Sequence, residues 1–294
     1  MKYKYLYFAF SLLFILPGLY FLIRHGLKPS VDFTGGSLLE ISLQSDKNIA
    51  LNELRPVVES EIALSNLQTA GVNTFIIRSQ VIDQSASQKL QTAISQKFGP
   101  VSEKRFETIG PTLGKELILK TIVGILLSAG FILGYVAYRF RNAKFGVCAI
   151  LAMLHDTFIM IGVFAFLGVY FGVEIDSLFV TALLTILSFS VHDTIVVYDR
   201  IRESQKLFPK LSFTQLVNKA VTETLGRSLN NSLTIIFMLL ALYLFGGSTT
   251  KWFVFALLIG TVSGTYSSTF TAAPLLVLWE EIKTSHSRHH TPGV

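Results

Sequence analysis

The chain has 294 residues, of which 51% are hydrophobic and only 15% are charged. Soluble domains carry about 25% charged residues, so this composition excludes an ordinary soluble protein and indicates a membrane protein. The net charge of +6 lies mostly in short loops between apolar stretches, which is a sign of membrane topology and not of nucleic-acid binding. Cys148 is the single cysteine, so the sequence excludes an intrachain disulfide.

Six apolar stretches are long enough to cross a bilayer, which takes about 20 residues. They are residues 5–23, 117–138, 145–171, 178–198, 228–245 and 252–279. The first has a longer apolar core than a signal peptide and no small-residue cleavage site after it, so we expect a retained helix. The sequence therefore predicts a polytopic α-helical membrane protein with six transmembrane helices. The first helix lies in residues 1–24, the other five lie in 116–280, and 281–294 form a tail.

Basic residues occupy alternate loops. Arg139, Arg141 and Lys144 lie between the second and third stretches, and a larger group lies between the fourth and fifth. The loop of residues 172–177 contains neither Lys nor Arg. The positive-inside rule then predicts that both termini and the tail are cytoplasmic and that residues 25–115 lie outside.

Residues 25–115 are polar in composition and contain short periodic segments. Residues 37–43, 72–79 and 101–109 are typical of strands, whereas 51–63 and 85–98 have helical spacing. Gly71 and the pair Gly99-Pro100 separate these segments. The order β-α-β-α-β predicts a small extracytoplasmic α+β domain of the split βαβ, ferredoxin-like type between the first and second transmembrane helices.

Small residues line parts of two membrane helices. Gly130 and Gly134 are four apart in the second, and Gly260 and Gly264 are four apart in the sixth. This spacing favours close approach of helix backbones. Residues 265–271 are rich in hydroxyl groups, for which helix packing and a wetted path are both possible roles.

Two His-Asp-Thr triplets interrupt otherwise apolar helices, with the acids Asp156 and Asp193. A carboxylate inside a membrane helix costs about 2.5–3.5 kcal/mol, so such a residue usually faces the bundle interior and carries protons, ions or substrate. At 1.5 Å per residue, Asp156 lies about 16 Å and Asp193 about 9 Å from the cytoplasmic helix ends. We expect both acids in one polar layer, with His155 or His192 sharing their protons. A purely structural hydrogen-bonding role is the alternative.

The predicted counter-charge of Asp193 is Arg227, at the start of the fifth apolar stretch. Arg227, Asn230, Asn231 and Thr234 recur at helical spacing and form one polar stripe. Arg200 is the competing partner, and a simple topology anchor is the alternative role of Arg227.

Known catalytic and cofactor motifs are missing from the sequence. It contains no glycine-rich phosphate loop, nucleophile elbow or zinc motif, so we expect no enzyme, cofactor or metal site. His286, His289 and His290 fit a solvated tail better than a metal site.

Five segments in order resemble the SecF branch of the SecD/SecF family of the RND superfamily. The first is VDFTGGS at residues 31–37, with Asp32, Phe33, Gly35 and Gly36 as its signature turn. The others are LHDT at 154–157, DTIVVYDRIR at 193–202, RSLN at 227–230 and GTYSS at 264–268. The resemblance covers essentially the whole chain.

The resemblance implies a multi-pass subunit of the bacterial cytoplasmic (inner) membrane. Its partners would be SecD, the SecYEG channel, the translocating preprotein and membrane lipid, and it would use the proton-motive force to assist export. Asp193 and Arg227 would take part in proton flow. His192 stands where the family usually has Asn, and Asn231 where it often has Thr. A proton-driven exporter of small amphiphiles and a non-conducting structural subunit are the alternatives.

Overall fold

The computed structural model describes residues 1–45, 47–140 and 142–289. Arg141 and His290 lie outside the described residues, and the side chains of His286 and His289 are likewise not described. The chain forms two compact units: Met1–Lys28 together with the residues from Gly124 onward, and Pro29–Val123. The second unit overlaps most of residues 25–115, where the sequence predicts a separate domain.

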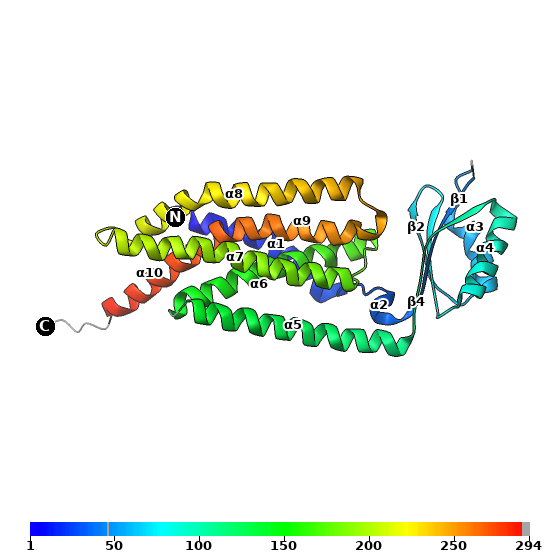
Figure 1. Cartoon of the computed structure of the whole chain (residues 1–294), viewed down its shortest axis with the longest axis horizontal. Coiled ribbons are helices and arrows are strands. Elements are labelled where there is room, and N and C mark those ends of the chain that lie inside the picture. The colour runs from blue at the N-terminus through cyan, green and yellow to red at the C-terminus, as the bar shows by residue number, and fades with distance from the viewer. Residues whose placement is uncertain (46, 141, 290–294) are drawn as a thin grey trace. The chain divides into compact units, whose positions relative to one another are not determined.

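Among the described residues, six helices are long and apolar enough to be membrane spans (Figure 1). They are α1 (Lys4–His25), α5 (Pro111–Arg139), α6 (Ala143–Phe171), α7 (Ser177–Leu207), α8 (Phe213–Phe245), and a sixth span in which α9 (Lys251–Ser267) continues through the π-helical turn η2 (Ser268–Ala272) into α10 (Ala273–His289). A short 3-10 turn, η1 (Ser248–Thr250), precedes α9. All six are long and apolar enough to cross a membrane, which confirms the predicted class.

Two helices extend well beyond their apolar stretches. Helix α7 continues to Leu207, and α8 begins at Phe213 rather than at residue 228. Charged residues continue both helices because they pair along or between them. Arg200 contacts Glu203 and Glu223, each at 2.6 Å. The apolar pattern of the sequence ends before the helices do, because backbone hydrogen bonding continues through charged residues.

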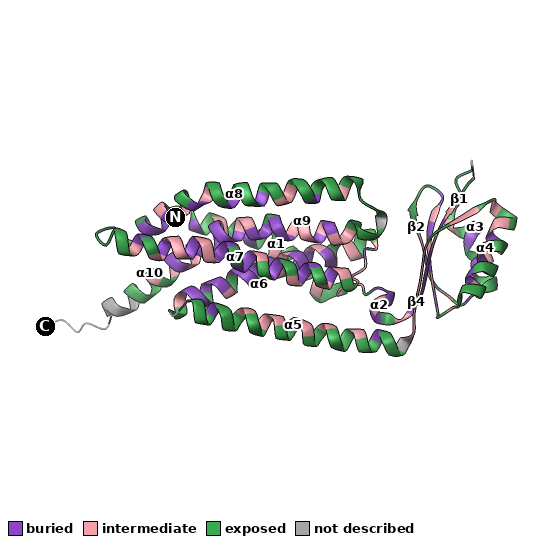
Figure 2. Cartoon of the chain, in the orientation of Figure 1, coloured by how far each residue is buried: buried purple, intermediate pink, exposed green. Residues whose placement is uncertain are grey.

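The interior of the bundle is built from α6, α7 and the sixth span. In the apolar part of each of these three spans, half of the residues are buried. Helix α1 packs on α6, and α8 packs on α7 and α9. Exposed residues predominate along α5 (Figure 2). Along α6 one apolar cluster ends at Met153 and the next begins at Met160, so the turn that carries Asp156 lies between two apolar layers.

Glycines set the closest helix contacts. A Cβ built on Gly162 would lie 2.6 Å from Cα of Gly18, so α1 and α6 touch through their backbones. A Cβ on Gly260 would lie 2.3 Å from the side chain of Ile186, which confirms close packing of α9 on α7. The expectation for Gly130 and Gly134 is wrong within this chain, because no described atom lies within 4 Å of a Cβ built on either.

The second unit contains a four-stranded antiparallel sheet in the order β2-β3-β1-β4. Its elements are β1 (Gly36–Leu43), α3 (Leu51–Glu61), β2 (Leu64–Gly71), β3 (Thr74–Ser79), α4 (Gln84–Phe98) and β4 (Val101–Ile109). Helices α3 and α4 cover one face of the sheet (Figure 1) and share a single apolar core with it. The element order is β-α-β-β-α-β, which is the order of a ferredoxin-like domain.

The sequence analysis missed strand β2. Leu67 is its only buried residue, because β2 lies at the edge of the sheet and its other side chains are partly or fully exposed. A two-residue turn, Val72-Asn73, joins β2 to β3, and Asn73 has a positive φ of 50°. The buried amide of Asn73 accepts a hydrogen bond from Ile49 N and donates to the carbonyls of Ser45 and Lys47.

We expect Asn73→Ala to destabilise this domain, because each buried group left unpaired costs about 1–3 kcal/mol. The measurement is amide hydrogen exchange of β2 and β3 in the detergent-solubilised full chain. Asn73→Gly is the matched control, since glycine tolerates the positive φ but makes none of the three hydrogen bonds. A glycine variant as stable as the wild type would mean that backbone conformation alone matters here.

Candidate functional site

The carboxylate of Asp156 is buried and fully surrounded by hydrogen-bond donors. Its Oδ2 accepts from the hydroxyls of Ser190 at 2.5 Å and Ser267 at 2.6 Å, and its Oδ1 accepts from Ser263 at 2.6 Å. Nδ1 of His155 lies 3.0 Å from Oδ1. Donors from α7 and α9 thus replace the water that a carboxylate would have outside the membrane.

Asp193 has a second, similar environment. The hydroxyl of Ser228 on α8 lies 2.9 Å from Oδ1 and 2.8 Å from Oδ2, and the hydroxyl of Ser268 donates to Oδ2. Only 5% of Asp193 is exposed. No basic side chain among the described residues forms an ion pair with it.

The two acids belong to one cluster of hydroxyl groups. Ser190, which donates to Asp156, lies one turn before Asp193 on α7. Ser267 and Ser268 are consecutive, and the first donates to Asp156 while the second donates to Asp193. The structure thus brings the acids of both His-Asp-Thr triplets together where α6, α7, α8 and the sixth span meet.

A π-helical turn shapes the cluster on the side of the sixth span. This turn, η2, starts at Ser268, and the buried hydroxyl of Tyr198 donates to the carbonyl of Ala272 at its end, at 2.9 Å. A π-turn accommodates an extra residue in a helix and is frequent at functional sites. The first residue of this π-turn, Ser268, contacts Asp193. A carboxylate of this kind is costly to bury in a membrane.

The expected ion pair between Asp193 and Arg227 is not formed. Arg227 is exposed and makes no ion pair with any described residue, while its neighbour Ser228 is buried and takes the place beside Asp193. Successive residues of a helix are about 100° apart, so when Ser228 points at Asp193, Arg227 points away from that carboxylate. Arg200 also bonds elsewhere, to Glu203 and Glu223.

Two other predicted residues do not reach the cluster. His192 is exposed, although Asp193 beside it is buried, and Asn231 is exposed on α8. His155 is the histidine that contacts an acid, and its Nε2 is buried with no described hydrogen-bond partner. The polar stripe of Arg227, Asn230, Asn231 and Thr234 therefore lies on the outer face of α8 within this chain.

The predicted signature turn forms the start of the sheet. Ser30 caps the short helix α2 (Val31–Thr34), which buries Phe33 and leaves Asp32 half-buried. Gly36 follows Gly35 at a φ of 114°, and a Cβ there would lie 2.7 Å from the carbonyl oxygen of Ser79. These glycines are required by the backbone, so the motif has a structural reason apart from any chemistry.

Sequence reasoning missed the serines that bind the acids. Ser190, Ser228 and Ser263 lie outside the hydroxyl-rich segment of residues 265–271. The available signal is spacing: Ser190 and Asp193 are three apart, and Ser263 and Ser267 are four apart, so each pair shares a helix face. Among the described residues, no group of three His, Cys, Asp or Glu side chains converges on a possible metal position.

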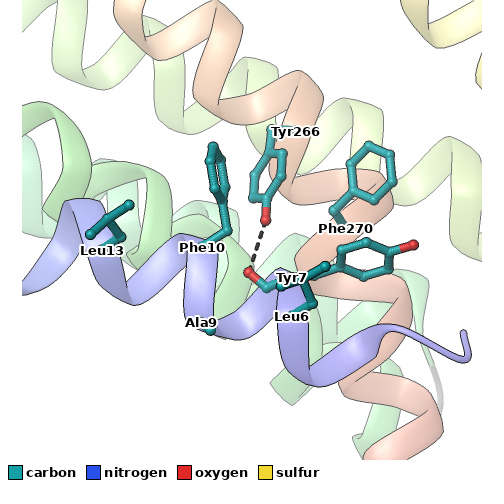
Figure 3. Close-up of a pocket in the computed structure, with 7 residues that line it drawn as sticks. All are labelled: Leu6, Tyr7, Ala9, Phe10, Leu13, Tyr266 and Phe270. Carbon is teal, nitrogen blue, oxygen red and sulfur yellow. Dashed lines mark hydrogen bonds between the residues drawn. The ribbon is translucent and has the colours of Figure 1, made fainter.

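A groove on the surface of the bundle lies near the cluster (Figure 3). It has a volume of about 600 Å³ and is lined by apolar and aromatic side chains of α1 and the sixth span, among them Phe10, Tyr266 and Phe270. The hydroxyl of Tyr266 donates to the carbonyl of Tyr7 at 2.9 Å, which ties the two helices together. The ring of Tyr266 also stacks on His155.

Known proteins resemble this chain over almost its whole length. Residues 70–282 match the family "Protein export membrane protein SecD/SecF, C-terminal", and residues 20–47 match the "SecD/SecF GG Motif". The "Protein translocase subunit SecF" of Thermobaculum terrenum is 44% identical over 95% of this chain and 93% of its own length. That of Anaerolinea thermophila is 41% identical over 94% of this chain and 92% of its own.

Fused relatives extend the comparison to solved structures. The "Protein translocase subunit SecDF" of Thermus thermophilus is 35% identical over 87% of this chain, but the match covers only 35% of that protein. A crystal structure titled SecDF, a translocon-associated membrane protein, from Thermus superposes with a TM-score of 0.84 at 32% identity, covering 96% of this chain and 38% of that one. The relatives support a role in Sec protein translocation as a transport component. The chain is a multi-pass membrane protein. The chain belongs to the SecD/SecF family of protein export membrane proteins.

Proposed function

We propose that this chain works with SecD and uses the proton-motive force to assist the export of preproteins across the bacterial cytoplasmic membrane. The observation that carries the proposal is the pair of buried carboxylates, Asp156 and Asp193, in one hydroxyl cluster between apolar layers. Neutral side chains would join helices at less cost than two acids, which favours a role in proton transfer.

Asp193 is the proposed main proton carrier, and Asp156 with His155 is the second. Protonation of Asp193 removes its charge and adds a donor, so the hydrogen bonds from Ser228 and Ser268 must rearrange. Because Ser268 begins the π-turn η2, this local change bears on the backbone of the sixth span. Moving one charge through 100 mV supplies about 2.3 kcal/mol, so a few protons can bias a two-state cycle.

The basic loops support the proposed topology. Arg139, Lys144 and the charged ends of α7 and α8 would face the cytoplasm together with both termini. The ferredoxin-like domain would then lie outside, where it can meet an emerging preprotein. No nucleic acid is among the proposed partners.

The proposed partners are SecD, the SecYEG channel, the translocating preprotein and membrane lipid. Support for SecD comes from the fused relative, in which both names join in one chain. Asn230, Asn231 and Thr234 are exposed on α8 within its apolar part, which is costly in lipid and fits contact with another membrane subunit. The translocase names of the relatives favour export over the transport of small amphiphiles.

The test is preprotein translocation into inverted membrane vesicles that contain or lack this chain, with and without a proton gradient. We expect the gradient to stimulate translocation only when the chain is present together with SecD. Affinity purification in mild detergent should recover SecD and channel subunits. Equal gradient stimulation without the chain would leave it as a non-conducting structural subunit.

A further inference from the structure

A polar cavity lies between α7 and α8, close to the loop that joins them. Its volume is about 460 Å³, and its walls include Val196 and Asp199 from α7 and Glu223, Thr224 and Arg227 from α8. Lipid tails cannot fill a space with carboxylate and guanidinium walls without a large cost, so water is its natural occupant.

Ion pairs within the protein hold the acids of the cavity wall. Asp199 contacts Arg139 and Arg202, and Glu223 contacts Lys219 at 3.0 Å in addition to Arg200. Arg227 is a further positive group on this wall. The wall is therefore charged and held in place by ion pairs, and it forms without the side chain of Asp193.

A row of buried hydroxyls leads from this cavity to Asp193. Thr224, Ser228 and Ser232 recur at every fourth residue of α8, and all three are buried. Thr224 lines the cavity, Ser228 bonds to Asp193, and Ser232 lies 2.6 Å from the hydroxyl of Thr265. Four residues of a helix rise about 6 Å, so Thr224 is one turn from the hydroxyl that contacts the acid.

We propose that this cavity is the aqueous vestibule through which Asp193 exchanges protons with the solvent at the α7–α8 loop, and that Thr224 positions the last water of the path. A hydronium ion in the vestibule gives its proton through this water to the carboxylate, leaving water and a neutral acid, and the reverse transfer releases the proton. The hydroxyl of Thr224 donates to the carbonyl of Ala220 at 2.9 Å, so its oxygen is free to accept from that water.

The vestibule deepens the proposed function and rests on it. It also gives Arg227 a place in the proton route without a direct ion pair to Asp193. Thr224 lies where the proton route reaches this cavity. It is a positioning residue, because it holds a water molecule and does not contact the preprotein.

Cysteine accessibility tests the vestibule independently of export. Cys148 is buried and is the only native cysteine, so Cys148→Ala provides a clean background. In inverted vesicles we expect Thr224→Cys to react with a membrane-impermeant thiol reagent, and Ser232→Cys, two turns further along α8, to remain unreactive. An inert cysteine at 224, or equal reaction at both positions, would overturn the proposal.

Substitution of the hydroxyl tests its role. Thr224→Val keeps the shape but not the oxygen, and we expect gradient-stimulated translocation to fall by about 100-fold, at the lower end of the range for lost proton-transfer assistance. Thr224→Ser should restore it, and Thr222→Val, an exposed threonine on the same helix, should leave it unchanged. Full activity of Thr224→Val alongside an inactive Asp193→Asn would overturn the vestibule alone. Full activity of Asp193→Asn would instead remove the proposed function.

Discussion

Asp193→Asn is expected to abolish the gradient-dependent part of preprotein translocation while the protein still folds and inserts. Asparagine has nearly the same shape, and its carbonyl oxygen can still accept a hydrogen bond from Ser228 or Ser268. It cannot titrate, so a cycle driven by protonation stops. The measurement is translocation into inverted vesicles with and without a proton gradient, which should give the same rate in both conditions.

The matched control for this variant is Glu116→Gln. Glu116 is a carboxylate on helix α5, but it is exposed, pairs with Lys120 at 2.7 Å and belongs to the other compact unit of the chain. This control should keep full gradient stimulation. If Asp193→Asn also kept it, with normal amounts of protein in the membrane, the acid would have a structural role only.

Gly162→Val is expected to separate α1 from α6 and to destabilise the bundle by about 3 kcal/mol or more, at the upper end of the usual cost of overpacking. The new side chain would meet the backbone of Gly18, which cannot move aside as a flexible side chain could. The measurement is thermal unfolding in detergent, together with crosslinking between cysteines placed on α1 and α6.

Gly130→Val on α5 is the matched control for the close contact. No described atom lies within 4 Å of a Cβ at this position, so the same substitution should leave the stability of the isolated chain unchanged. A stability loss at Gly130 as large as at Gly162 would mean that valine acts through general helix effects and not through the contact with α1.

The glycines illustrate how far the sequence predicts helix packing. The spacing of Gly130 and Gly134 is the same as that of Gly260 and Gly264, yet only the second pair packs closely within this chain. The contact between Gly18 and Gly162 joins two single glycines that are far apart in the sequence. Neither belongs to a pair of glycines four residues apart, so no motif in the sequence indicates the contact. A small residue permits close approach, but the partner helix decides whether it occurs.

The edge strand β2 shows a similar limit in the second unit. Strands β1 and β3 are recognisable because they lie inside the sheet and bury alternate residues against α3 and α4. Strand β2 buries only Leu67, so its sequence lacks the alternation, although its backbone pairs with β3 from Leu64 to Gly71 with a register shift near each end. Backbone hydrogen bonds depend little on side-chain type, which is why hydrophobicity did not predict this strand.

The sequence by itself determined the six spans, the α+β domain and the presence of two acids at membrane depth. These are properties of composition along the chain, because placing an apolar run in lipid is favourable and placing a charge there is costly, and each segment has these free energies by itself. Only the tertiary structure decided that Ser228 and not Arg227 faces Asp193, and that Ser190, Ser263 and Ser267 surround Asp156. That choice depends on the rotation of each helix about its axis, about 100° per residue, and the packing of neighbouring helices fixes the rotation.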